Sequence, residues 1–153
     1  MYQLCIDNDW GDPFSYARSR EIYMAAVLGH TVAPTYSGAD GIQPNGELAE
    51  YKSTIGKNIN ATYNGISVQP TWSEQKLYLI DSKICKYPNH YFARFDAGKI
   101  VELWVMEAPI VFCILKQKLK KKYDKLHTSK LKDPRLGATI TMSEIHKYGT
   151  KLI

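Results

Sequence analysis

The spacing of apolar residues predicts four helices in this chain. Apolar positions recur every three to four residues between Asp12-Pro13, where Asp12 can cap a first turn, and Gly29, where a helix can end. The other helical segments are residues 74–86, residues 108–127 and a short stretch that ends at Tyr148-Gly149. Pro109 suits the start of the third helix, because the first turn needs no N–H from that position.

Strand patterns lie between these helices. Residues 31–42 look extended, and the turn Pro44-Asn45-Gly46 leads from them into ELAEYKSTI, so the two segments are predicted to form a hairpin. Residues 91–95 and 99–106 are rich in aromatic and β-branched side chains and predict a second hairpin. A strand is expected near residues 139–142, and the polar stretch 56–73 is a long loop with room for one more strand.

The order of these elements predicts one mixed α/β domain over residues 1–153. A chain of 153 residues has room for one core, and 44% hydrophobic residues is normal for a folded protein. The net charge of +5 favours a polyanionic partner, although many basic proteins bind nothing anionic. Composition alone therefore leaves the function open.

The cysteines and the absence of targeting signals bear on the compartment. Cys5, Cys85 and Cys113 are odd in number and far apart, which predicts reduced thiols in or near the core of an intracellular protein. The first residues do not read as a secretory signal, and no apolar stretch reaches the length of a membrane span. We therefore expect a cytoplasmic protein with no membrane partner.

The first predicted hairpin carries the residues with the clearest chemistry. Glu50 and Lys52 share one face of a strand because strand side chains alternate, and the turn at Asn45-Gly46 folds the segment with Asp40 back alongside. Two carboxylates on adjacent strands suit Mg²⁺, and the backbone carbonyl of Tyr51 can add another oxygen ligand. Lys52 can orient or deprotonate a water, or stabilise charge growing on phosphorus.

Acidic residues and lysine at this spacing also occur by chance, as a solvated surface without activity. Three features favour chemistry: the strand–turn–strand context, the preceding helix, and the small residues Ser37-Gly38-Ala39, which let a DNA backbone approach closely.

The pattern Asp40, Glu50, Lys52 resembles the PD-(D/E)xK nuclease superfamily, with Ala39 where that motif has proline. More narrowly, the chain resembles PvuII-like Type II restriction endonucleases. The similar stretches are LGHTVAPTYSGADGIQPNGELAEYKS (residues 28–53), NHYFARFDAGKIVELWVME (residues 89–107) and DPRLGATITMSEIHKYGTKLI (residues 133–153). They occur in the right order and cover nearly half of the chain.

The resemblance implies a restriction-endonuclease-like fold, in which helices flank a central mixed β-sheet. It also implies a homodimer that uses Mg²⁺ to cut double-stranded DNA at a short, palindromic site. Asp40 and Glu50 would be metal ligands, and Lys52 would activate the water. The N-terminal helix region is a reasonable dimer surface. Two alternatives stay open: a structure-directed or repair nuclease of the same superfamily, such as a junction resolvase, and a DNA-binding module without catalysis.

The resemblance fails where base recognition is expected. The family reads bases partly with a histidine-rich segment after the catalytic strand, whereas this chain has GKNINATYNGISVQPTW, which is longer and lacks histidine. Polar side chains there can reach base edges in the major groove, and they are equally typical of any exposed loop. These candidates are Asn60, Asn64, Ser67, Gln69 and Thr71. The target sequence is expected to differ.

Other polar residues have two interpretations each. Glu21 on the first helix is a candidate accessory acid or, alternatively, a surface ion-pair partner of Arg18 or Arg20. Residues 116–132 hold eight lysines and one acid, so this helix either contacts phosphate or presents a solvated face. The four histidines have no metal-ligand spacing and are expected to serve packing or surface roles.

Overall fold

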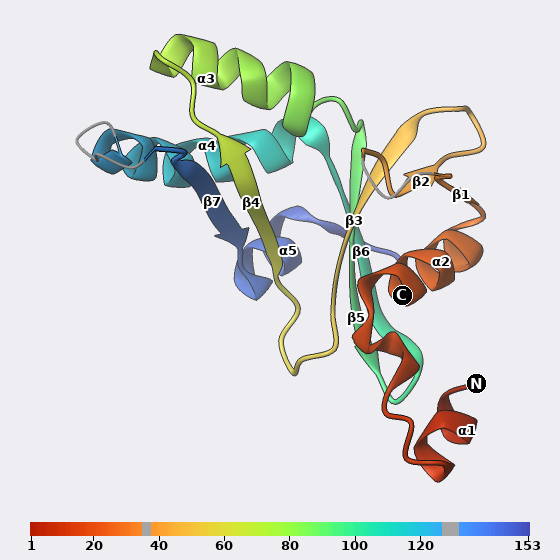
Figure 1. Ribbon diagram of the computed structural model, residues 1–153. Helices are drawn as coiled ribbons and strands as arrows, with labels where there is room; N and C mark the ends of the chain where they lie inside the picture. Colours follow the sequence, from red (N-terminus) through yellow and green to blue (C-terminus); the bar gives the residue numbers. More distant parts are fainter. Residues whose placement is uncertain (35–37, 127–131) are drawn as a thin grey trace.

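A computed structural model describes residues 1–34, 38–126 and 132–153 of the chain (Figure 1). In chain order its elements are α1 (Tyr2–Asp7), η1 (Pro13–Ser15), α2 (Ala17–Leu28), β1 (Thr31–Val32), β2 (Gly41–Ile42), β3 (Leu48–Thr54), β4 (Ala61–Ser67), α3 (Trp72–Tyr78), η2 (Leu79–Lys83), β5 (Asn89–Asp96), β6 (Lys99–Glu107), α4 (Ala108–Leu126), β7 (Arg135–Ile140), α5 (Met142–Tyr148) and β8 (Thr150–Lys151). The short element η1 is a 3-10 turn, and η2 is a turn of π-helix that continues α3.

The described strands form two sheets. The larger has the order β1-β2-β3-β5-β6-β8, and β4 and β7 pair separately. Only β3 and β5 run parallel, and the other neighbours are antiparallel. The protein is therefore a mixed α/β structure with a mostly antiparallel sheet, as the order of elements predicts. Figure 1 shows α2 on one side of the larger sheet, with α3, α4, α5 and the β4–β7 pair on the other.

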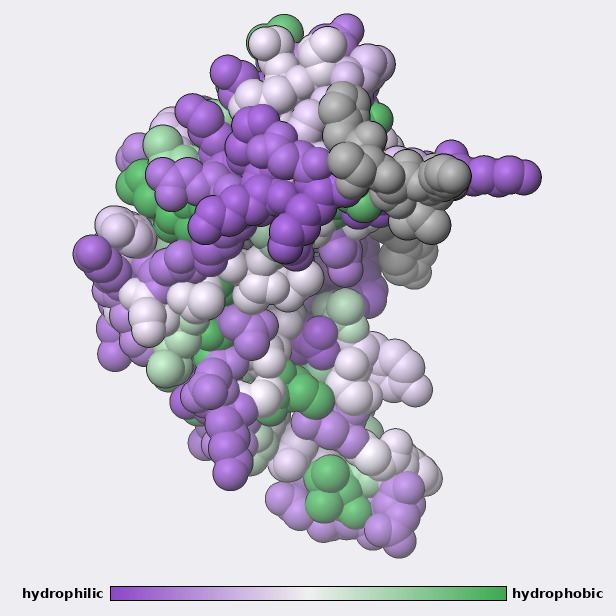
Figure 2. Space-filling view, turned by 90° about the vertical axis from the view of Figure 1, so that its left-hand side faces the viewer, coloured by the Kyte–Doolittle hydropathy of each residue, from purple (hydrophilic) through white to green (hydrophobic). Residues whose placement is uncertain are grey.

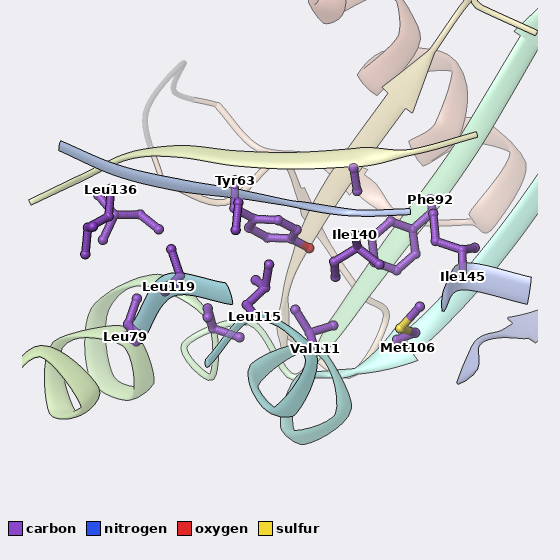
Figure 3. Close-up of a cluster of buried hydrophobic side chains, with 14 of the residues drawn as sticks. Tyr63, Leu79, Phe92, Met106, Val111, Leu115, Leu119, Leu136, Ile140 and Ile145 are labelled. Carbon is purple, nitrogen blue, oxygen red and sulfur yellow. The ribbon is translucent and has the colours of Figure 1, made fainter. Parts of the chain in front are cut away.

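Each face of the larger sheet covers its own apolar core. On the α2 side, Met24 and Ala25 pack with Tyr51, Phe95 and other side chains of β3, β5 and β6. The core on the opposite side is larger and combines buried side chains of β4, η2, α4, β7 and α5 with Phe92 and Met106 of the sheet (Figure 3). Burying a large apolar side chain of this kind stabilises the fold by roughly 1.5–3 kcal/mol. The strand β3 thus runs between two packed layers.

The predicted first helix is present but interrupted. The Asp12 carboxylate accepts a hydrogen bond from the Phe14 N–H at 2.8 Å, as a capping residue should. That cap serves only the turn η1, because the extended backbone of Tyr16 ends it before α2 begins. The helix α2 then ends at Gly29, whose φ of +69° is the left-handed conformation that glycine adopts at low cost.

The predicted helix over residues 74–86 is shorter and changes type. A capping box joins Thr71 and Glu74, so α3 begins two residues before the predicted start. After Tyr78 the chain winds as a π-helix to Lys83 and then leaves the helix. The later helices match their predictions: α4 covers residues 108–126, and α5 ends before Gly149. His127, the predicted last residue of the long helix, lies outside the described residues.

The prediction of one extended segment over residues 31–42 is wrong. Within it, β1 and β2 are two short strands that pair with each other, Thr31 with Ile42 and Val32 with Gly41. The predicted hairpins are confirmed as β2–β3 and β5–β6. The polar stretch 56–73 does hold a strand, β4, and the strand predicted near residues 139–142 ends at Ile140.

The thiols differ in exposure. Cys5 and Cys85 are half-buried, whereas Cys113 is exposed, so the prediction of a core or near-core position is wrong for Cys113. The cause is helix geometry: Val111 and Leu115 direct α4 into the core, and residue 113 falls on the outer face. No helix in the described part of the chain combines the length and apolar character needed to cross a membrane.

Candidate active site

The pairing register of β2 and β3 brings Asp40 next to Glu50. Gly41 pairs with Ala49, so one residue further along this antiparallel ladder Asp40 stands opposite Glu50. Two hydrogen bonds hold Asp40 there. Its N–H donates to the Ala49 carbonyl at 3.0 Å, and its Oδ2 accepts from the Tyr51 N–H at 2.8 Å.

Strand alternation separates the polar side chains of β3 from the apolar ones. Ala49 and Tyr51 are buried in the core beneath α2, and Glu50 and Lys52 project from the opposite face. There the Lys52 Nζ lies 2.7 Å from Glu50 Oε1, and both side chains are largely shielded from solvent. The structure therefore brings together the three residues that the sequence predicts as the catalytic set.

A tight contact beside Asp40 depends on glycine. A Cβ on Gly41 would lie 2.2 Å from the Tyr51 hydroxyl oxygen, far inside van der Waals contact. That hydroxyl also forms a 2.7 Å hydrogen bond with His30 Nδ1 at the end of α2. Gly41 thus lets the Tyr51 side chain pack under the hairpin that carries Asp40.

The two carboxylates affect each other's charge. Burial, followed by the negative charge of Glu50, raises the pKa of Asp40 from 3.8 to about 7, against the lowering effect of the Tyr51 N–H. A cation between them would remove the repulsion that keeps a proton on Asp40. The site therefore favours binding of a positive ion.

The donor set fits Mg²⁺, which takes oxygen ligands and keeps several of its waters. Asp40 and Glu50 supply two carboxylates, and the backbone of Tyr51, whose carbonyl is the third predicted ligand, lies between Glu50 and Lys52 on β3. Among residues 1–34, 38–126 and 132–153, His, Cys, Asp and Glu side chains form no group of three or more that could hold a metal. A bound Mg²⁺ would therefore depend on these two carboxylates, backbone oxygen and water.

A cleft of about 390 Å³ opens in front of Glu50 and Lys52. Its floor includes Tyr63 of β4, and the Lys52 Nζ lies 4.9 Å from the centre of the Tyr63 ring. The buried hydroxyl of Tyr63 is bonded to His90 Nδ1 at 2.9 Å, and His90 Nε2 lies 2.9 Å from the Ile84 carbonyl. His90 is fully buried, which confirms its predicted packing role.

The tautomer of His90 follows from these contacts. Because the Ile84 carbonyl can only accept, Nε2 carries the proton and Nδ1 accepts from the Tyr63 hydroxyl. Burial is the main cause that lowers the pKa of His90, to about 4. A neutral histidine therefore holds the ring that lies under the amine of Lys52.

Glu21 forms the ion pair that was its alternative interpretation. Its carboxylate lies 3.1 Å from Arg18 Nη1, and the Arg18 side chain also donates to the Ala33 carbonyl at 2.8 Å. Glu21 is nevertheless close enough for its charge to raise the pKa of Asp40. It therefore lies beside the site and is engaged with Arg18.

The predicted base-reading residues occupy different environments. Asn64 is exposed on β4 and lines the cleft, and Asn60 is exposed just before that strand. The Thr71 hydroxyl caps α3, and Ser67 Oγ accepts from Arg135 at 2.5 Å. Gln69 is bonded through its backbone to Gln75 and Tyr123. Asn64 alone of the five lines the cleft with Glu50 and Lys52.

The lysines of α4 lie on a hydrophilic surface. Lys116, Lys121 and Lys122 are exposed, while Lys118 bonds to Glu144 at 2.6 Å and Lys120 to Asp124 at 2.6 Å. Figure 2 shows hydrophilic side chains gathered over the upper part of the face that it presents. The last part of the lysine-rich run, residues 127–131, lies outside the described residues, as does Ser37 of the small-residue stretch before Asp40.

Several residues around the cleft were not expected from the sequence. Tyr63, Lys83 and Lys86 line it, and His90 supports Tyr63 from beneath. The capping box at Thr71-Glu74 was a usable signal for the position of α3, but no sequence pattern indicated the π-helical turn after it. Tyr63 could not be placed because the pattern of residues 56–73 did not define where β4 begins.

Comparisons with known proteins do not identify the chain. No protein-family model matches it, and no curated protein matches it either. The functional interpretation therefore depends on the geometry of the site.

Proposed function

We propose that this protein is a Type II restriction endonuclease, which uses Mg²⁺ to hydrolyse phosphodiester bonds in duplex DNA at a short specific site. The observation that carries the proposal is the β2–β3 register, which sets Asp40 opposite Glu50 while Lys52 contacts Glu50 on the same face of β3. Two acids and a lysine at the edge of a polar cleft are suited to metal-assisted phosphodiester hydrolysis.

The residues of the site divide the work. Asp40 and Glu50 would hold Mg²⁺, which when bound supplies charge stabilisation and a water of lowered pKa. Lys52 places an ammonium group beside these carboxylates, where it orients or deprotonates the water, or stabilises negative charge on the phosphate. Burial of the set against Tyr63 strengthens each of these charge interactions.

The proposal includes a homodimer, because two copies related by a two-fold axis present the same site to both strands of a palindrome. The N-terminal region supports it with exposed apolar side chains around a cavity of about 620 Å³, lined by Trp10, Tyr16 and Ile22 among others. This surface is larger and more apolar than scattered single residues would produce.

Digestion of a long duplex DNA with Mg²⁺, followed by sequencing of the cut ends, tests the activity. Discrete fragments that share one end sequence are expected. Cutting only at junctions or nicks would instead identify a structure-directed nuclease. An intact duplex with every divalent metal would leave only a DNA-binding module and would overturn the proposal.

The variant Asp40→Ala tests the site. Cleavage should fall by at least about a hundredfold while duplex binding persists, because the carboxylate acts on the metal and not on the DNA. Glu47→Ala is the matched control, since Glu47 is an exposed acid on the same hairpin and its loss should leave cleavage unchanged. An Asp40→Ala protein that still cuts would mean that the catalytic centre lies elsewhere.

A further inference from the structure

The wall of the cleft opposite Lys52 is built by the π-helical turn and the residues that follow it. Ser82, Lys83 and Lys86 line this wall, facing Glu50 and Lys52 across the opening. Three lysines therefore surround the cleft against one lining carboxylate, so its charge balance is positive even before a metal binds.

Lys83 and Lys86 differ from the other lysines near carboxylates. Lys52, Lys118 and Lys120 are all within ion-pair distance of an acid. In the part of the chain that the structure describes, neither Lys83 nor Lys86 forms such a pair. Their amines lie instead 5.8 Å from the ring centres of Tyr78 and Tyr87, respectively, and both side chains are exposed. Their charge is thus available to an anion in the cleft.

The backbone that presents these lysines is anchored on the core. Leu79 and Ile84 are fully buried, and the Ile84 N–H donates to the Leu79 carbonyl at 2.7 Å, which closes the π-turn. The Ile84 carbonyl in turn accepts from His90, and Tyr87 is buried just beyond Lys86. Lys83 and Lys86 therefore project from either side of a fixed residue.

The π-turn has a positional effect. A π-turn inserts one residue into the helical repeat, which shifts the face on which later side chains emerge, and such turns occur often at functional sites. Here the shift follows α3 directly, and Lys83 is the last residue of the turn. The irregular winding thus sets the direction of the lysines that line the cleft.

We propose that this wall binds the backbone phosphates of the DNA strand on either side of the bond that Asp40, Glu50 and Lys52 act on, with Lys83 and Lys86 as the phosphate contacts. The inference rests on the proposed function, since it assigns the path of the same substrate. Lysine is a point-charge partner for phosphate, and such contacts release counterions and make binding salt-dependent. Asn64, on the floor of the cleft, is then the polar side chain nearest to this strand.

The test measures binding of a short duplex of mixed sequence, without divalent metal, at a series of salt concentrations. The double variant Lys83→Gln and Lys86→Gln should lower the slope of log K against log salt by about 1.8, at about 0.9 per phosphate contact. Changing both residues to Arg should restore the slope. The matched control, Lys99→Gln with Lys147→Gln, removes two exposed lysines outside the cleft and should leave the slope near that of the unchanged protein.

The outcomes separate this inference from the proposed function. If the unchanged protein does not bind duplex DNA, the proposed function fails, and the inference fails with it. If it binds, but the cleft variant keeps its slope or loses no more than the control does, the phosphates lie elsewhere and only the inference is overturned. Thermal unfolding of each variant checks that the fold is retained, as expected for exposed side chains.

Discussion

The ring of Tyr63 is the single side chain that links the core to the catalytic lysine. A cation over an aromatic face gains about 0.5–2 kcal/mol, and here the ring lies 4.9 Å from the Lys52 Nζ. Replacing Tyr63 by Leu removes this support and should lower kcat roughly fivefold at unchanged KM. Tyr63→Phe keeps the ring and should keep the rate, although it leaves His90 Nδ1 without its donor and costs about 1–2 kcal/mol of stability.

Steady-state kinetics of both variants, with urea unfolding as the measure of stability, separates the two roles of Tyr63. A purely structural residue would show rates that follow stability in both proteins. Equal losses of kcat in the Leu and Phe variants would therefore contradict positioning by the ring.

His90 makes stability depend on pH in a defined window. An unfolded histidine takes up a proton near pH 6.5, whereas burial lowers the pKa of His90 in the folded protein to about 4. Its contribution is therefore complete above pH 6.5 and is lost as the pH falls toward 4, with a limit of about 3 kcal/mol. Urea unfolding at pH 7.5 and pH 5 should show a smaller drop for His90→Gln than for the unchanged protein. A drop of equal size in both would mean that other groups cause the acid sensitivity.

At the residue scale, sequence reasoning reached the acids and the lysine but not their surroundings. Asp40, Glu50 and Lys52 were predictable because strand alternation and the turn at Asn45-Gly46 are local properties. The contacts of Tyr63 with His90 and Lys52 join segments far apart in the chain. No local pattern encodes such contacts, since they arise only when two sheets pack together.

At the element scale, strong periodicity and clear turn residues gave correct elements. The long helix α4 and the β5–β6 hairpin match their predicted positions, because apolar spacing and turn chemistry agree there. Short elements were missed: α1 and β8 were not expected, and residues 31–42 contain two strands in place of one segment. Two-residue strands depend on their partners and carry almost no sequence pattern of their own.

The π-helical turn η2 shows the limit of element prediction most clearly. Residues 74–86 have helical spacing, and the sequence therefore predicted one regular helix. Tertiary contacts decide otherwise, since buried Leu79 and Ile84 and the bond from His90 to the Ile84 carbonyl stabilise the wider winding. The proposed phosphate-binding wall consequently lay beyond what periodicity could reveal.

At the scale of the whole molecule, the N-terminal apolar surface determines whether one copy can act alone. Trp10, Tyr16 and Ile22 are 68%, 73% and 50% exposed around one cavity, which is costly for a monomer in water. We expect sedimentation to give a mass of twice 17.4 kDa. The variant Ile22→Glu should be monomeric, because a charge buried in the interface without a partner opposes association.

Leu77→Glu is the control for this change, since Leu77 is 59% exposed on α3, away from the N-terminal surface, and its variant should remain dimeric. A monomeric Ile22→Glu protein should also lose double-strand cleavage, because one active centre reaches only one strand of a palindrome. If the unchanged protein sediments at 17.4 kDa even when bound to duplex DNA, the two-fold arrangement is wrong. The Asp40–Glu50–Lys52 centre would then have to cut the two strands in separate encounters, and a mixture of nicked and linear DNA would accumulate.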